Sequence, residues 1–344
     1  MQRKNNIGFI AFSCFFYIVC IALMTVGSIY DLSIGKTVFD PENSFARFAE
    51  SFGQFVYWGM WGPALTVIFL CRRDLNGNLT VIGKVFPFIK PIKNTESKAY
   101  KVLNIIVKTV LTVGFFVLTV VGWKKLIENV TKNILQSLGK DDLSSAFYFI
   151  ISAVVAVIAI LLFSKISKNT LKRLEAVALA SVLFGIFLKL VEECKTITER
   201  VRIREMVAYS NGFLNDRGLS EGRYSPLTSD MAQNTDFSAF TPWYKIGDDM
   251  GIYNRADSFP SGHTSYSCTL FISYIFCRMF EKLKPLAPVM LAVSAAYVAA
   301  MGYSRMIAGA HYLTDVVGAA IIGYTLFIIV KSLYDTFTRK EIIG

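Results

Sequence analysis

The chain is poor in charge for its length. Only 18% of its 344 residues are charged, whereas 53% are hydrophobic, and the mean hydropathy is +0.46. Soluble globular chains carry about 25% charged residues, and disordered chains have little apolar content. The composition therefore excludes a disordered protein and an ordinary cytosolic enzyme. It points to a membrane protein with several spans.

Paired cysteines are also missing. None of the six Cys forms a CxxC pair, and most lie in apolar stretches, where a free thiol behaves as a small hydrophobe. Nothing in this spacing predicts a disulfide framework or a zinc site, and we expect no metal and no cofactor. Histidine is scarcer still, since the chain has only His263 and His311.

Eight apolar stretches are long enough to cross roughly 30 Å of hydrocarbon as helices. They are 7–29, 52–71, 103–123, 145–164, 174–192, 261–280, 286–303 and 310–331. The predicted fold class is all-α, a polytopic membrane helix bundle with about eight transmembrane helices. The first stretch resembles a signal peptide, but its long apolar run without an A-x-A site favours a retained helix.

A basic segment, 72–101, separates the first two helices from the rest. We therefore expect two parts: 1–101, with two helices and a cytoplasmic linker, and 102–344, a six-helix core. The core contains a long extracytoplasmic loop, 193–260. Three interpretations are open for its aromatic residues: a lid over a lipid chain, an interfacial belt or a small core of the loop itself. These residues are Tyr209, Phe213, Tyr224, Trp243, Tyr244 and Tyr253.

The distribution of Lys and Arg predicts the topology. The side that holds both termini carries 19 of them and the other side carries 15, of which eight lie in the long loop at 193–260. Long loops are largely exempt from the positive-inside rule, so the contrast indicates cytoplasmic termini. The net charge of +11 is then explained by basic cytoplasmic segments that lie next to anionic lipid. We therefore expect no nucleic-acid partner.

Both histidines lie at outer helix ends beside other polar residues. His311 and Asp315 are four residues apart, so they share one face of a helix. A carboxylate at that spacing can fix the tautomer of the imidazole and leave its other nitrogen free to attack. His263 follows Ser261 and Gly262, whose backbone N–H groups would open a helix and suit an anion.

Cations accompany the histidines. Lys195 and Arg202 are seven residues apart, two turns on one face if the fifth span continues as a helix, and Arg305 adds a fork suited to phosphate oxygens. The sequence does not assign a position to Arg200 or Arg204. Arg200 is expected either at the mouth of the site or as a charge that faces solvent or lipid headgroups. Cations, N–H donors and two histidines together are what phosphoryl transfer needs.

These three groups resemble the signature of the type 2 phosphatidic acid phosphatase superfamily, which reads K-x6-R-P, P-S-G-H and S-R-x5-H-x3-D. The chain has Lys195-x6-Arg202-Ile203, then Pro260 to His263, then Ser304-Arg305-x5-His311-x3-Asp315. Ile203 departs from the usual Pro, which leaves the cations in place. The resemblance covers about 102–335, so the first two helices lie outside it.

The resemblance implies a metal-independent phosphatase that works through a phosphohistidine. It assigns His311 as the nucleophile, Asp315 as the residue that orients it, and His263 as the general acid and later the base. It also implies a phosphate-binding set consisting of Lys195, Arg202, Ser261, Gly262 and Arg305.

The function expected is hydrolysis of a lipid phosphate or pyrophosphate monoester at the extracytoplasmic face. Candidate substrates are a polyprenyl pyrophosphate, phosphatidic acid, phosphatidylglycerol phosphate and a phosphorylated glycolipid. One alternative is a lipid-to-lipid phosphotransferase at the same site. Another is a transporter or a silent membrane scaffold, which the uncharged span centres and the intact motifs disfavour. The lack of a recognisable sorting signal favours a bacterial plasma membrane, and no oligomeric state is predicted.

Overall fold

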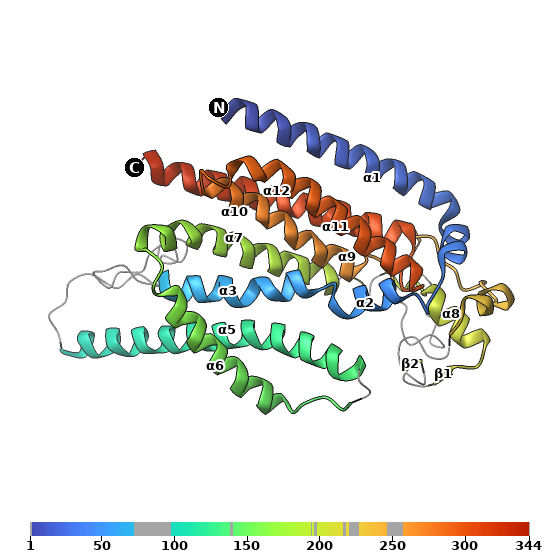
Figure 1. Ribbon diagram of the computed structural model, residues 1–344, viewed down its shortest axis with the longest axis horizontal. Helices are drawn as coiled ribbons and strands as arrows, with labels where there is room; N and C mark the ends of the chain where they lie inside the picture. Colours follow the sequence, from blue (N-terminus) through green and yellow to red (C-terminus); the bar gives the residue numbers. More distant parts are fainter. Residues whose placement is uncertain are drawn as a thin grey trace. The chain divides into compact units, whose positions relative to one another are not determined.

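The computed structural model describes residues 2–71, 98–137, 140–193, 195, 198–215, 218–219, 227–245 and 257–343. They are almost entirely helical, which confirms the all-α class (Figure 1). Within these residues, seven helices are long and apolar enough to cross a membrane: Ile7–Val38, Ser44–Cys71, Thr109–Leu135, Ser145–Phe163, Lys168–Glu193, Lys284–Ile307 and Leu313–Thr336. The protein is thus a polytopic helical membrane protein.

The span expected at 261–280 is a helix in three pieces. Helix α9 (Gly262–Ser267) leads into the 3₁₀ helix η4 (Cys268–Phe271), which leads into α10 (Ile272–Met279). The hydroxyls of Ser265 and Ser267 donate to main-chain carbonyls three residues earlier, at 3.0 and 2.6 Å. Such bonds compete with the hydrogen bonds of a regular α-helix. Within the described residues, seven helices have the length and hydropathy of a span, and this segmented helix occupies the place of the remaining one of about eight expected.

The chain folds into two compact units. The first contains residues 1–56 and 184–333, and the second contains 57–183 and 334–344. All three motifs lie in the first unit, together with α1 (Gln2–Val38) and α2 (Ser44–Phe52). The expected boundary at residue 101 coincides with no unit boundary. The division of the chain into 1–101 and 102–344 as functional parts stays a prediction.

In the first unit, α1 and α2 both pack against α11 (Ala287–Ile307), which follows the 3₁₀ helix η5 (Lys284–Leu286). Side chains of α1 also contact α12 (Leu313–Ile343). The rings of Phe16 and Tyr324 lie 4.4 Å apart between α1 and α12. A Cβ at Gly27 would lie 2.8 Å from the Thr314 methyl, so glycine permits the close approach of α1 to the start of α12. These contacts fix α1 beside the third motif.

The loop expected at 193–260 builds a small core of its own. It contains α8 (Ile203–Ser210), the hairpin strands β1 (Leu214–Asn215) and β2 (Gly218–Leu219), and the 3₁₀ helix η3 (Ser229–Asn234). A buried apolar cluster joins this loop to α1 and α12; its members include Val201, Ile203, Met206, Val207, Leu227, Phe39 and Tyr312. This cluster holds the chain segment that carries Arg200, Arg202 and Arg204.

The aromatic residues of this loop have different surroundings. Phe213 packs against the buried cluster, as the small-core reading predicts. Trp243 stacks on Phe259, while Tyr209 and Tyr244 are exposed. The remaining two aromatics considered, Tyr224 and Tyr253, lie outside the described residues.

The second unit holds α3 (Phe55–Cys71), α5 (Lys98–Ser137), α6 (Ser145–Phe163) and most of α7 (Lys168–Glu193). Trp123 of α5 lies against Gly62 of α3, and its indole N–H donates to the hydroxyl of Thr66 at 3.1 Å. Large apolar side chains such as Ile150 of α6 are exposed. That pattern fits helices that face lipid.

Candidate active site

Each residue that the motifs predicted lies in the first unit, and most are buried. Lys195, Arg202, Ser261, Gly262, Arg305, His311 and Asp315 are buried, and His263 is partly buried. The N–H of Ser261 donates to the Asp315 carbonyl at 3.1 Å, and the imidazole of His311 bonds to the carbonyl of Ser258 at 2.7 Å. The second and third motifs therefore meet directly.

His311 is oriented by a backbone carbonyl. Its Nδ1 lies 2.7 Å from the Ser258 oxygen, so Nδ1 carries the proton in that bond. In the neutral ring the other nitrogen, Nε2, is then unprotonated and holds the lone pair that a nucleophile needs. The geometry produces the tautomer that the spacing of His311 and Asp315 predicts, through a different acceptor.

Asp315 does not hydrogen-bond to the His311 ring directly, as the sequence suggested, but contacts the segment that holds the ring. Its Oδ2 lies 3.8 Å from Nδ1 of His311, beyond hydrogen-bond distance. The same oxygen accepts from the hydroxyl of Ser258 at 2.5 Å and from the N–H of Tyr312 at 2.8 Å. Asp315 thus fixes the Ser258 segment whose carbonyl holds His311.

Arg200 is the centre of a buried ion network that the sequence did not predict. It is fully buried, so neither the mouth of the site nor a solvated position is observed. Its guanidinium pairs with Asp315, and with Asp31 of α1 at 2.7 Å. It also lies over the ring of Tyr312, 4.1 Å from the centroid, a cation–π contact. Arg200 thus links α1 to the carboxylate behind His311.

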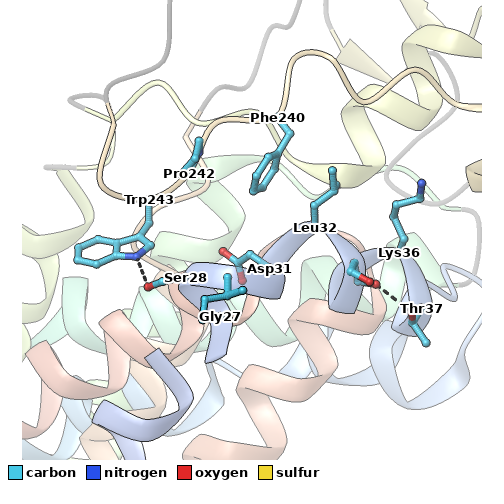
Figure 2. Close-up of a pocket in the computed structure, with 11 residues that line it drawn as sticks. Gly27, Ser28, Asp31, Leu32, Lys36, Thr37, Phe240, Pro242 and Trp243 are labelled. Atoms are coloured by element: carbon cyan, nitrogen blue, oxygen red, sulfur yellow. Dashed lines mark hydrogen bonds between the residues drawn. The ribbon is translucent and has the colours of Figure 1, made fainter. Parts of the chain in front are cut away.

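Asp31 carries this network into α1. Its carboxylate accepts from the N–H of Thr314 at 3.0 Å and from the hydroxyl of the same residue. Asp31 lines a cavity of about 490 Å³. Figure 2 shows Asp31 on α1, with Phe240, Pro242 and Trp243 of the loop on the opposite side. The indole of Trp243 donates to Ser28 at 2.9 Å. The loop therefore packs over α1 where Asp31 enters the network.

Lys195 and Arg202 do not share a helix. Helix α7 ends at Glu193, Glu199 adopts a positive φ of 43°, and Arg202 is extended at the start of α8. The expectation of a continuing helix with both cations two turns apart on one face is wrong, because the chain turns between them. Arg202 instead pairs with the Asp257 carboxylate at 2.7 Å.

Gly262 gives Lys195 its place. A Cβ at Gly262 would lie 2.6 Å from the Lys195 ammonium nitrogen, so only glycine allows this approach without a shift. The N–H of Ser261, expected to bind the anion, is instead bonded to the Asp315 carbonyl. The second motif therefore contacts Lys195 through Gly262 and Asp315 through Ser261. The N–H of Ser261 already donates a hydrogen bond to Asp315 and is not available to an anion in this state.

Arg305 and Arg204 meet at one carboxylate. The guanidinium of Arg305 lies 2.9 Å from Glu50 of α2, and that of Arg204 lies 3.4 Å from the other oxygen of Glu50. All three side chains are buried. Sequence reasoning left Arg204 open and did not consider Glu50. An acidic residue followed closely by an apolar run was the available signal.

His263 is bonded at both ring nitrogens. Its Nε2 lies 3.2 Å from the main-chain oxygen of Glu50, and its Nδ1 lies 3.3 Å from the amide nitrogen of Gln54. The arrangement fits a neutral ring that donates to the carbonyl and accepts from the amide. In this state the end of α2 covers the predicted general acid.

The field at His311 is strongly positive. Burial lowers the pKa of His311 well below its ordinary value of 6.5, and Arg202, Lys195, Arg305 and Arg204 lower it further. Burial also lowers the pKa of Lys195, an effect opposed by Glu192. His311 is therefore a neutral base inside a cage of cations. Such a cage attracts an anion and stabilises charge that develops on it.

The acidic side chains close to His311 are paired with arginines. Within the described residues, no group of three or more His, Cys, Asp or Glu is placed to hold a metal ion. Asp31, Glu50 and Asp315 are instead each paired with arginine. The residues that surround His311 are thus suited to an anion.

The region with the second and third motifs matches a known family. Residues 221–339 match the model of the PAP2 superfamily. This match confirms the resemblance predicted from the motifs, while Lys195 and Arg202 lie before the matched residues.

One characterised relative is similar to part of the chain. Over 90 residues the chain is 27% identical to the phosphatidylglycerophosphatase B of Bacillus subtilis strain 168, and the aligned part is 26% of this chain and 44% of that protein. The similarity thus spans less than half of the relative. No solved structure matches the chain significantly.

Proposed function

We propose that this chain, with its PAP2-superfamily region at 221–339, is a membrane lipid phosphatase that forms a phosphohistidine on His311. The observation that carries the proposal is the state of His311. Its Nδ1 is bonded to the Ser258 carbonyl, which leaves Nε2 as the nucleophile. Lys195, Arg202, Arg204 and Arg305 surround it with positive charge.

The steps follow from this geometry. His263 takes up a proton from solvent when the negatively charged phosphoryl group binds beside it. Nε2 of His311 then attacks phosphorus, the bond to the lipid oxygen breaks, and His263 gives its proton to that oxygen. The cations hold the equatorial oxygens as charge builds on them. Water then attacks the phosphohistidine, His263 takes up a proton from it, and inorganic phosphate leaves. His311 returns to the neutral ring held by Ser258.

We propose that no metal takes part in these steps. The charge that a divalent ion would supply to the phosphoryl oxygens comes from Lys195 and the three arginines. Burial and then these cations lower the pKa of His311, so their positive charge acts at the ring that is proposed to react. A divalent cation in the same place would be repelled by them.

A lipid substrate is supported by an apolar groove in the first unit. It has a volume of about 450 Å³ and is lined by side chains of α1, α11 and α12. Its lining includes Thr264, the neighbour of His263, and Met306, the neighbour of Arg305. A chain in this groove would place its headgroup at the cations. By the positive-inside rule we propose that this end faces the extracytoplasmic side, with both termini cytoplasmic.

Filling the groove should separate long-chain from soluble substrates. Ala299 lines it, and Ala299→Trp is expected to lower kcat/KM for a long-chain lipid phosphate by about tenfold or more, since the chain loses apolar contact. A short water-soluble phosphate ester should be hydrolysed as by wild type. The matched control is Ala300→Trp, at an exposed neighbour on the same helix. Equal losses on both substrates, or in both variants, would contradict the placement of the tail.

Phosphate release in the presence of EDTA tests the proposed function. Wild-type protein in detergent would be given phosphatidylglycerol phosphate, phosphatidic acid and a polyprenyl pyrophosphate, with released phosphate measured before and after chelation. We expect release from at least one lipid and no loss with EDTA. Loss of activity with EDTA, restored by a divalent metal, would overturn metal independence. Phosphate that appears on a second lipid instead of in water would make the protein a transferase.

A further inference from the structure

Helix α2 puts a carboxylate where the proposed site needs an anion. Glu50 bridges the guanidinium groups of Arg305 and Arg204 at 2.9 and 3.4 Å. All three side chains are almost completely buried, with 6% of Glu50 exposed. Arg204 belongs with Lys195, Arg202 and Arg305 to the cations that act on His311. The bridging carboxylate therefore lies within the cationic cage.

The same helix end covers His263. The main-chain oxygen of Glu50 is hydrogen-bonded to Nε2 of its ring, and the side-chain amide of Gln54 is hydrogen-bonded to Nδ1. A histidine held at both nitrogens has no lone pair or proton to offer a substrate. In this state Glu50 occupies Arg204 and Arg305, and Glu50 and Gln54 together occupy His263. Neither the arginine pair nor the predicted general acid is then available to a substrate.

The arginine donors are incompletely used in this arrangement. The Nε–H groups of Arg204 and Arg305 are buried and make no hydrogen bond within the described residues; the Nε of Arg204 faces Glu205 at 3.7 Å, beyond hydrogen-bond distance. A carboxylate offers two oxygens to the pair, whereas a phosphoryl group offers three in a tetrahedral arrangement. A phosphoryl group can thus satisfy donors that Glu50 leaves unused.

Other contacts already hold α2 in place. The side chain of Asn43 caps the helix by accepting from the N–H groups of Phe45 and Ala46. The hydroxyl of Tyr297 donates to the Gly53 carbonyl at 2.7 Å. Ala46 packs into a buried cluster with residues at the end of α11. The Glu50 bridge adds to these anchors at the point nearest the cations.

We propose that Arg204 and Arg305 form an anion pocket for the phosphoryl group, and that the Glu50 carboxylate occupies it until substrate takes its place. Displacement frees the arginine pair, and the accompanying movement of Gln54 and the Glu50 carbonyl releases His263. This makes Arg204 a further substrate-binding residue and Glu50 an internal competitor. The identity of the substrate rests on the proposed function; the anion pocket itself does not.

Binding of inorganic phosphate to Glu50→Gln tests this inference. Thermal unfolding of the detergent-solubilised protein would be followed against phosphate concentration, with chloride added to keep the ionic strength constant. Without phosphate the variant is expected to unfold at a lower temperature than wild type, because two buried arginines lose their counter-ion. Phosphate should restore it, with half-maximal effect at a concentration at least about tenfold lower than for wild type.

Glu205→Gln is the matched control for simple electrostatics. Glu205 is also buried and lies 3.7 Å from Arg204, but it does not bridge to Arg305. Its neutralisation removes the same charge without opening the pocket, so the affinity for phosphate should change far less than in Glu50→Gln. Adding Arg204→Ala to Glu50→Gln should abolish the gain.

Three results would overturn the inference. They are a Glu50→Gln variant that phosphate does not stabilise, equal phosphate affinity in this variant and wild type, and an equal gain in Glu205→Gln. If Glu50→Gln does not fold, Glu50→Asp keeps the charge on a shorter side chain and should still bind phosphate more tightly than wild type. Because no turnover is measured, these results do not depend on the proposed function. Lipid hydrolysis by the wild type together with unchanged phosphate affinity in Glu50→Gln would contradict this inference and leave the proposed function standing.

Discussion

Replacing His311 by alanine is expected to lower phosphate release by a factor on the order of 10⁴ or more, the scale seen when a covalent nucleophile is removed. The reason is that Nε2 of His311 is the atom proposed to attack phosphorus, and no other histidine shares its position. The measurement is steady-state hydrolysis of the preferred lipid, with thermal unfolding used to show that the variant is folded.

His263→Ala provides the comparison that separates the two histidines. General acid catalysis contributes roughly 10² to 10⁴ in rate, and a leaving group of low pKa needs little of it. We therefore expect His263→Ala to recover much of its first step with an aryl phosphate, whereas His311→Ala stays inactive with every substrate. Recovery of His311→Ala with the aryl phosphate would contradict the assignment of the nucleophile.

Removing Arg200 should produce the largest loss of stability in the molecule. Arg200→Ala leaves the buried carboxylates of Asp31 and Asp315 without their counter-ion. Breaking a buried ion pair by removing one partner costs about 3–5 kcal/mol. Activity should fall as well, since Asp315 positions the Ser258 segment that holds His311.

Thermal unfolding of the purified variants measures this effect. Arg173→Ala is the control, because Arg173 is exposed on α7 and its loss should leave the unfolding temperature close to that of wild type. Asp31→Asn, which keeps the shape of the side chain, should destabilise less than Arg200→Ala. A wild-type unfolding temperature for Arg200→Ala would contradict the role given to the buried network.

Local spacing predicted part of the site correctly. His311 and Asp315 lie near each other, because only four residues separate them at the start of one helix. The all-α class could be predicted because the apolar stretches are long enough to cross the bilayer as helices, even when their exact ends are uncertain. The division of the helix at 262–279 into three pieces could not be predicted this way, because hydropathy does not register the serine bonds to its main chain.

Contacts between distant parts of the chain were beyond the sequence. Asp31 pairs with Arg200, and Glu50 with Arg305, across more than 150 residues, and no local pattern encodes such pairs. The helix expected to continue from Lys195 to Arg202 fails for a related reason. The buried cluster of the outer loop, rather than helix periodicity, positions that segment. The first two helices, which the family signature does not include, thus supply two acidic residues to the site.

Trapping the phosphoenzyme tests the central claim, that His311 carries the phosphoryl group. Radiolabelled lipid phosphate would be mixed with wild type, His311→Ala and His263→Ala, and the reaction stopped with alkaline detergent, because a phosphorus–nitrogen bond survives base and breaks in acid. We predict label on the peptide that contains His311 in wild type, longer-lived label in His263→Ala and none in His311→Ala. Label on another residue, or an unlabelled wild type during steady turnover, would contradict the account.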